Sequence, residues 1–138
     1  MKITKNQVWF ILTASVLCCF FHLSLTNSIE NRNLLMVYLI PIMYAVLMFS
    51  NGFFFGKRDR QSLALYDVGF RFHVSTYIIH NLVTEIYYLF DLQSIHETYF
   101  QIRIFELFWG VGLLLHLVLF LNTRKHAIKG IKKEEIFE

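Results

Sequence analysis

Four long apolar runs dominate this sequence and restrict the folds that are open to it. They cover residues 8–25, 34–55, 68–90 and 104–121, so each run holds 18 to 23 residues. A helix rises about 1.5 Å per residue, and runs of this length therefore reach roughly 27 to 35 Å, enough to cross a ~30 Å hydrocarbon core. Transmembrane β-strands are shorter and alternate in polarity. The runs predict an all-α integral membrane protein with four transmembrane helices.

Composition agrees with a chain that is surrounded by lipid. Hydrophobic residues make up 56% of the chain and charged residues only 17%. Lys2 and Lys5 precede the first run, as they would in a signal peptide. No cleavage site of the Ala-x-Ala type follows residue 25, however, so we expect the first run to remain as an uncleaved span.

Basic residues are distributed unevenly between the two ends of the predicted spans. Arg32 and Arg103 fall on one side. The other eleven of the thirteen fall on the opposite side: Lys2, Lys5, Lys57, Arg58, Arg60, Arg71, Arg124, Lys125, Lys129, Lys132 and Lys133. Loops rich in Lys and Arg stay in the cytoplasm. Because four spans return the chain to its starting side, both termini are predicted to be cytoplasmic.

The spans divide the chain into four predicted regions. Residues 1–56 form an N-terminal transmembrane helix pair, and residues 57–67 form a cytoplasmic loop. Residues 68–122 form a helical hairpin, and residues 123–138 form a charged cytoplasmic tail. The apolar residues of the tail are spaced for a short interfacial helix, and a solvated tail is the alternative.

Polar side chains concentrate on one face of the third run. At about 100° per residue, they fall within roughly a quarter of the helix circumference: His73, Tyr77, His80, Asn81 and Thr84. The opposite face is wholly apolar and is expected to contact lipid. Polar groups inside a bilayer face protein or water, because an unsatisfied group is costly there. The stripe is therefore predicted to be a helix-packing face.

The fourth run carries a matching set of residues: Phe105, Trp109, Gly112, His116 and Thr123, with Gly110 as a further position for close helix approach. Counted from the cytoplasmic side, His73 and His116 lie at the same depth. Asn81 is level with Trp109 by the same count. Glu85 approaches the level of Arg103, which predicts an ion pair near the outer surface.

The two runs together carry a recognisable motif. Phe70-x-x-His73-x-x-x-Tyr77-x-x-x-Asn81 is followed, after the loop, by Trp109-Gly110-x-Gly112-Leu113-x-x-His116. Residues 60–138 thereby resemble the two-transmembrane (2TM) domain of small bacterial membrane proteins, notably those of the Bacteroidetes. His80 departs from the family pattern, and the Trp and Pro that often precede the Trp-Gly element are missing. The resemblance implies a helical hairpin in the bacterial inner membrane and a part in signalling.

The motifs of common enzymes are absent. The sequence has no glycine-rich phosphate loop, no nucleophile elbow and no His-Glu-x-x-His. We therefore predict a non-enzymatic interaction or regulatory component, in an oligomer or a larger membrane complex. Its expected partners are membrane lipids and either copies of itself or other membrane proteins. Nucleic acid is not an expected partner, because the basic residues lie at the membrane edges.

Two alternatives use the histidines. His73 and His116, at one depth, could ligate a b-type haem through both axial positions, which would need the rings to lie across a bundle or a dimer. Otherwise no cofactor is predicted. His80 could conduct protons or ions with Asn81, Thr84 and Glu85 in an oligomer.

No metal site is predicted. His73 and His80 are about 10 Å apart along a helix, too far for one coordination shell. Cys18 and Cys19 are read as small apolar residues of the first span. The remaining histidines, His22, His96 and His126, are expected to be interfacial or solvated.

Overall fold

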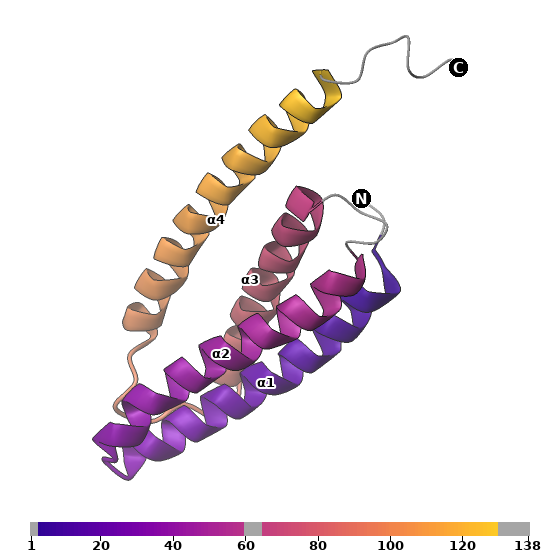
Figure 1. Ribbon diagram of the computed structural model, residues 1–138. Helices are drawn as coiled ribbons and strands as arrows, with labels where there is room; N and C mark the ends of the chain where they lie inside the picture. Colours follow the sequence, from indigo (N-terminus) through magenta and orange to yellow (C-terminus); the bar gives the residue numbers. More distant parts are fainter. Residues whose placement is uncertain (1–2, 60–64, 130–138) are drawn as a thin grey trace.

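The computed structural model describes residues 3–59 and 65–129, and it is built from four α-helices. These are α1 (Lys5–Glu30), α2 (Leu34–Asp59), α3 (Leu65–Leu89) and α4 (Tyr99–Lys129), shown in Figure 1. The predicted all-α class and the four helices are confirmed. Of the predicted 57–67 loop, residues 57–59 end α2, residues 65–67 begin α3, and only residues 60–64 lie outside the described residues. Of the predicted 123–138 tail, residues 123–129 continue α4 and residues 130–138 lie outside the described residues.

Three of the helices, α1, α2 and α4, are long and apolar enough to cross a membrane, by length and composition. The fourth, α3, has a similar length of 25 residues but carries the polar stripe, and it does not reach the same apolar composition. The chain thus has the composition of a multi-span membrane protein.

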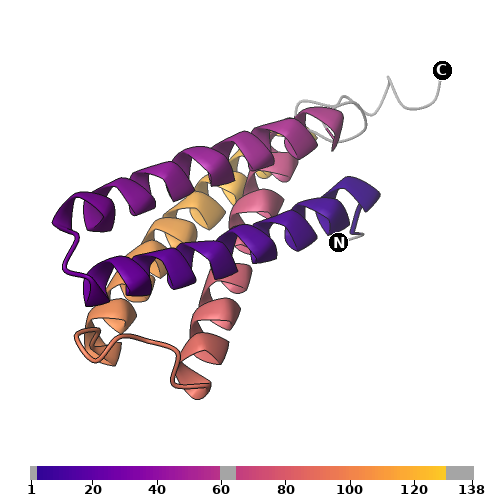
Figure 2. The same cartoon turned by 90° about the horizontal axis from the view of Figure 1, so that it is seen from below.

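The helices form a bundle in which α3 contacts all three others. In the order of the chain they run up and down, so α1 and α3 are parallel and α2 and α4 run the opposite way (Figure 1). Within the described residues, α4 packs against α3 alone, and its backbone approaches neither α1 nor α2. Figure 2 shows the loop that follows α3 reaching across to the start of α4. The bundle is therefore a three-helix core with α4 added on one side.

The core lies where α1, α2 and α3 meet. Its buried apolar members are Phe10, Ala14, Met48, Val68, Phe72 and Ile79. On α2, Gly52 and Gly56 are one turn apart and face this core: a Cβ at Gly52 would lie 3.8 Å from the Phe10 ring, and one at Gly56 would lie 3.4 Å from Val68. Two glycines at this spacing let helices approach closely, so they set the packing of α2.

Polar contacts fix the end of the bundle at which α1 begins. Thr4 caps α1 by accepting from the Gln7 backbone N–H at 3.0 Å. Its hydroxyl also donates to Asp59 at 2.5 Å, and the Asn6 amide donates to the other oxygen of Asp59 at 2.7 Å. These contacts tie the start of α1 to the end of α2.

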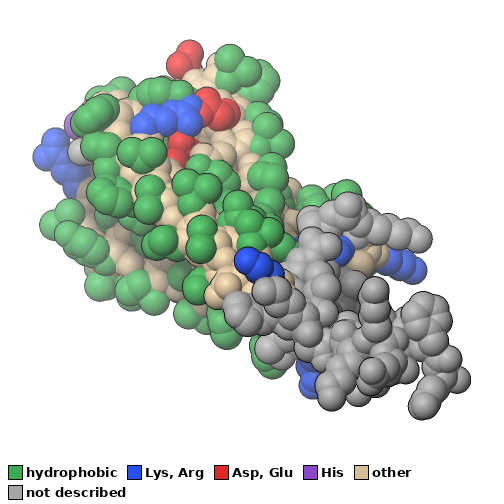
Figure 3. Space-filling view, turned by 90° about the horizontal axis from the view of Figure 1, so that it is seen from above, with side chains coloured by type: hydrophobic (Ala, Val, Ile, Leu, Met, Phe, Trp, Pro, Cys, Tyr) green, Lys and Arg blue, Asp and Glu red, His purple; other side chains and the backbone are tan. Residues whose placement is uncertain are grey.

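Apolar side chains cover much of the described surface on the face seen in Figure 3. Large exposed ones occur along each helix, for example Phe20, Phe49, Leu82 and Leu114. A water-soluble protein rarely exposes apolar patches this extensive. The face of α3 opposite the polar stripe is apolar and largely exposed, as predicted, except that Val83 packs against the core.

Candidate functional site

A row of polar side chains runs along the contact between α1 and α3. We call it the polar seam, and it consists of Gln7, Cys18, His22 and Thr26 on α1 with Ser75, His80, Thr84 and Tyr87 on α3. The amide of Gln7 donates to Ser75 at 3.0 Å. Farther along, Tyr87 donates to Thr26 at 2.9 Å. Because the two helices are parallel, the pairs succeed one another in the same order on both.

Helical periodicity explains how the seam forms. Cys18, His22 and Thr26 are four residues apart, so they project from one face of α1, one turn above another. His80 and Thr84 are likewise four residues apart on α3. The two rows meet when the helices pack in parallel, and each polar group then finds a partner inside the bundle.

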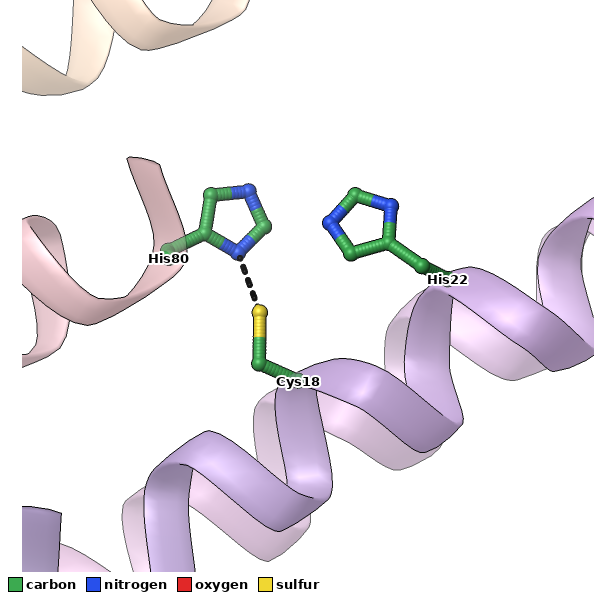
Figure 4. Close-up of side chains that lie close together, drawn as sticks. All are labelled: Cys18, His22 and His80. Atoms are coloured by element: carbon green, nitrogen blue, oxygen red, sulfur yellow. Dashed lines mark hydrogen bonds between the residues drawn. The ribbon is translucent and has the colours of Figure 1, made fainter. Parts of the chain in front are cut away.

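The centre of the seam brings together Cys18, His22 and His80. One potential ligand atom from each residue lies within 4.8 Å of the others. The Cys18 Sγ is 3.4 Å from the His80 Nδ1, and Figure 4 shows both imidazole rings pointing toward each other from opposite helices. Cys18 and His22 are buried, and His80 is half-buried. Among the described residues, this is the one group of three side chains with metal-ligand spacing.

Hydrogen bonds and aromatic rings enclose this cluster. The Tyr44 hydroxyl lies 3.2 Å from the His80 Nδ1, and the Thr84 hydroxyl lies 3.0 Å from the His22 Nε2. Thr84 also donates to the His80 carbonyl at 2.7 Å. The Tyr87 ring stacks on His22 at 5.0 Å between centroids, and the Trp109 ring lies 5.1 Å from His80. The surroundings are thus mostly aromatic.

Sequence reasoning placed His22 wrongly. It was expected to be interfacial or solvated, yet it is 5% exposed and bonded to Thr84. Cys18 is also more than a small apolar residue, because its thiol faces His80. The four-residue spacing of Cys18, His22 and Thr26 was the signal that could have identified the seam. His96 lies in the exposed loop after α3, and the side chain of His126 is outside the described residues.

The polar stripe predicted on α3 divides between two neighbours. His80 and Thr84 face α1, whereas His73 and Tyr77 face α4. The Asn81 amide donates to the Tyr77 carbonyl at 2.7 Å, within α3 itself. Because α3 lies between α1 and α4, one edge of the stripe packs against α1 and the other edge packs against α4.

His73 and His116 meet between α3 and α4, with ring centroids 4.7 Å apart. This is the pairing expected from their equal depth. The rings are in contact as they stand, so a porphyrin would fit between them only if the two helices moved apart. Haem ligation by this pair stays a prediction.

The face that α4 turns toward α3 differs from the predicted one. Glu106 and Phe120 are buried there, whereas Phe105, Gly112 and Thr123 are exposed. The helix is rotated, so that Trp109, Gly110 and His116 of the predicted positions lie at the contact with α3. Trp109 packs edge-on against Tyr77 at 5.8 Å, rather than against Asn81. Gly110 makes room for Tyr77, whose hydroxyl lies 3.0 Å from where a Cβ would be.

Arg103 organises the end of α4 near the loop. It pairs with Glu85 of α3, the partner expected from the depth count, and with Glu106 at 2.6 Å. Its guanidinium also contacts the Tyr99 hydroxyl and lies over the Tyr99 ring. The buried Glu106 was not expected in this network. Glu85 therefore belongs to an ion-pair network and is separate from the polar seam.

Glu97 closes the seam at the same end of the bundle. Its carboxylate accepts from the Thr26 hydroxyl at 3.0 Å. Burial raises the pKa of the Glu97 carboxyl, whereas hydrogen bonds from Thr26 and from the Ser94 backbone lower it, and the nearby Glu30 charge raises it further. The net shift is upward, so the ionised form is disfavoured in the folded protein.

This shift predicts a pH-dependent stability. A carboxyl with a raised pKa binds its proton more tightly in the folded state, so stability falls as pH rises through the folded pKa. The loss of stability begins as the pH rises above 4.5, the ordinary pKa of a glutamate carboxyl. We expect Glu97→Gln to unfold at a higher temperature than the wild type at about pH 7, and the difference to vanish toward about pH 4. Thermal unfolding in detergent at several pH values measures this. Unfolding temperatures that change with pH in the same way for the two proteins would contradict this prediction.

Two hollows adjoin α4. A cleft of about 330 Å³ lies between α2, α3 and α4, and its lining includes Gly52, Gly56, Gly69, His73, Thr76 and Trp109. A shallow groove of about 280 Å³ lies on α4 itself, and we call it the α4 notch; it is lined by Gly112, Leu115, His116, Leu119, Phe120 and Thr123. Nothing lies within 4 Å of a Cβ added at Gly112. Polar and small residues thus face outward on an otherwise apolar helix.

No family model, curated protein or solved structure matches the chain. Its resemblance to the 2TM domain therefore stays a prediction from the motif residues.

Proposed function

We propose that this chain is a four-span protein of the bacterial inner membrane, with both termini in the cytoplasm. In this proposal it acts without chemistry of its own, as an interaction component that associates with a second copy through the α4 notch. The observation that carries the proposal is the incomplete packing of α4, which contacts one neighbour and leaves Gly112, His116 and Thr123 facing outward.

The proposed fourth span is α3. Its 25 residues reach about 37 Å, which is long enough to cross a bilayer. Its polar side chains are directed into the contacts with α1 and α4, and its remaining face is apolar. A helix whose polar groups are covered by neighbours can lie in a membrane despite a moderate overall hydropathy. The concentration of eleven basic residues on one side supports the proposed orientation.

The notch has the properties of a helix contact within lipid. Association there depends on close packing and on polar groups, because lipid chains are as apolar as the side chains. Gly112 removes bulk at the surface, and the half-exposed His116 one turn away offers hydrogen bonds. Lipid would leave the imidazole unsatisfied, so a protein surface is the better cover.

A second copy is the proposed occupant. Around a two-fold axis the same patch meets itself, so Gly112 of one copy would lie against Gly112 of the other. No side chain would then separate the two α4 backbones at the crossing. The long apolar face on either side of the notch, including Leu115 and Leu119, would extend the contact.

The test is a substitution that fills the notch without disturbing the single chain. Since Gly112 has open space around it, Gly112→Leu should leave the helix content unchanged and should not lower the unfolding temperature of the monomer. We expect it to reduce the dimer fraction in lipid vesicles at least about tenfold, as measured by energy transfer between labelled copies at fixed protein density.

Ser24→Leu is the matched control, because it adds similar bulk at an exposed position of α1. It should dimerise like the wild type. A wild type that remains monomeric, or a Gly112→Leu variant that associates normally, would overturn the proposal.

A further inference from the structure

We propose that Cys18, His22 and His80 bind one soft, monovalent metal ion, copper in its Cu(I) state, in the interior of the bundle. The site is formed within a single chain and does not depend on association through the α4 notch. The proposal rests on the spacing of three ligand groups on two packed helices. It also rests on the net charge of the metal with its ligands, because a charged unit is costly inside a membrane.

The spacing already approaches that of a coordination shell. Metal–nitrogen bonds of about 2.0 Å and metal–sulfur bonds of about 2.3 Å place the ligand atoms of a trigonal site roughly 3.5 to 4 Å apart. The Cys18 Sγ and the His80 Nδ1 are 3.4 Å apart, and all three potential ligand atoms lie within 4.8 Å of one another. Small side-chain rotations are therefore sufficient, and no helix has to move.

The two helices hold the ligands on opposite sides of one point. Cys18 and His22 lie one turn apart on α1, and His80 faces them from α3 (Figure 4). Metal binding replaces the hydrogen bond between His22 and Thr84 and the one between Tyr44 and the His80 Nδ1. The Tyr44 hydroxyl, which also hydrogen-bonds Cys18, can then donate to the thiolate. Thr84 remains satisfied, because its hydroxyl still donates to the His80 carbonyl at 2.7 Å.

The donor types select a soft ion. Thiolate favours Cu(I) and Zn²⁺, and imidazole accepts both metals. The cluster contains no carboxylate, which argues against Mg²⁺, Ca²⁺ and Mn²⁺, whose preferred ligands are oxygen atoms. Three donors satisfy Cu(I), whereas structural Zn²⁺ sites almost always have four.

Net charge decides between copper and zinc. Cu⁺ with one thiolate and two neutral imidazoles is a neutral unit, whereas Zn²⁺ with the same ligands leaves one positive charge. An uncompensated charge is costly in a low-dielectric interior. Within the described residues, Glu85, which follows Thr84 in the sequence, pairs with Arg103, and Glu97, at the end of the seam, accepts from Thr26.

Metal binding is an exchange of Cu⁺ for a proton, and no atom changes its oxidation state. Cu⁺ replaces the thiol proton of Cys18, a Cu–S bond forms as the S–H bond breaks, and one H⁺ passes to the aqueous phase. The metal has to be supplied as Cu(I). Rings from Phe21, Tyr44, Tyr87 and Trp109 surround the two imidazoles and limit the access of water to the site.

The experiment uses the full chain in lipid nanodiscs that each hold one copy, titrated without oxygen with Cu(I) as its acetonitrile complex. A chromophoric Cu(I) chelator competes for the metal. We expect one Cu(I) per chain and an X-ray absorption spectrum with one sulfur at about 2.2–2.3 Å and two nitrogens at about 2.0 Å. A spectrum that lacks sulfur would overturn the proposal, as would the absence of uptake.

Two variants test one proposed ligand from each helix. Cys18→Ser and His80→Gln should each weaken Cu(I) binding at least about 100-fold. Cys19→Ser is the matched control, because Cys19 is the neighbouring but exposed thiol, and it should bind like the wild type. Equal losses in Cys18→Ser and Cys19→Ser would overturn the assignment. So would binding of Zn²⁺ as tightly as Cu(I).

Circular dichroism checks that each variant remains helical. If a ligand variant does not fold, the wild-type spectrum and the Cys19→Ser titration still decide the question. Because each nanodisc holds one copy, loss of copper binding refutes the metal site and leaves the proposed dimer untouched. Loss of dimerisation in Gly112→Leu refutes only the dimer.

Discussion

Phe10→Ala should lower the free energy of unfolding by about 2–3 kcal/mol. Phe10 is 1% exposed and packs against Phe72 with ring centroids 4.7 Å apart. It also fills the space opened by Gly52 on α2. Truncation in a water-soluble core costs about 3–5 kcal/mol. The lower figure applies because lipid is as apolar as the core, so the loss is one of packing alone.

Phe20→Ala is the matched control for Phe10→Ala. It removes the same ring from the same helix, but Phe20 is 64% exposed. We expect it to change the unfolding free energy by less than about 0.5 kcal/mol. Unfolding by sodium dodecyl sulfate in mixed micelles, followed by circular dichroism, measures both variants. Similar losses in the two would show that the core does not lie where α1, α2 and α3 meet.

The helices were predictable because the apolar runs are long and few residues interrupt them. Runs 8–25 and 34–55 lie inside α1 and α2, which extend a few residues beyond them on polar side chains. An apolar run marks only the part of a helix that would lie in the hydrocarbon core. The helix itself continues until other groups bind the free polar groups at the end of its backbone. This is why α2 extends to Asp59, where Thr4 and Asn6 bind the carboxylate.

The pairing of α1 with α3 was not predictable from the periodicity of either helix taken alone. Periodicity assigns a residue to a face of its own helix but does not identify the helix that the face meets. His22 was therefore judged alone, although it lies opposite Thr84 and beside His80. The polar spacing on α1 and on α3 had to be compared to show that the two rows match.

The rotation of α4 is a related case. Trp109, Gly112 and His116 share a face, and the sequence offered no reason to exclude that face from the contact with α3. The structure instead buries Glu106, because Arg103 reaches it at 2.6 Å while also pairing with Glu85. An ion-pair network at one end of the helix thus contributes to its rotation, and that effect has no hydropathy signature.

The same network gives the second large expected effect. Arg103→Met should lower the free energy of unfolding by about 2–3 kcal/mol, because it leaves the buried Glu106 carboxylate, 4% exposed, without a counter-charge. Breaking a fully buried pair costs about 3–5 kcal/mol. The Arg103 side chain is 37% exposed, and solvent screening accounts for the smaller value.

A second substitution separates the two carboxylates that Arg103 serves. Adding Glu106→Gln to Arg103→Met removes the orphaned charge and should recover at least half of the lost stability. Adding Glu85→Gln instead should recover little, because the Glu85 side chain is 44% exposed and water can solvate it. The same detergent titration measures all of these variants. Equal rescue by the two additions would mean that the buried Glu106 charge is not what makes Arg103 necessary, and the rotation of α4 would then need another cause.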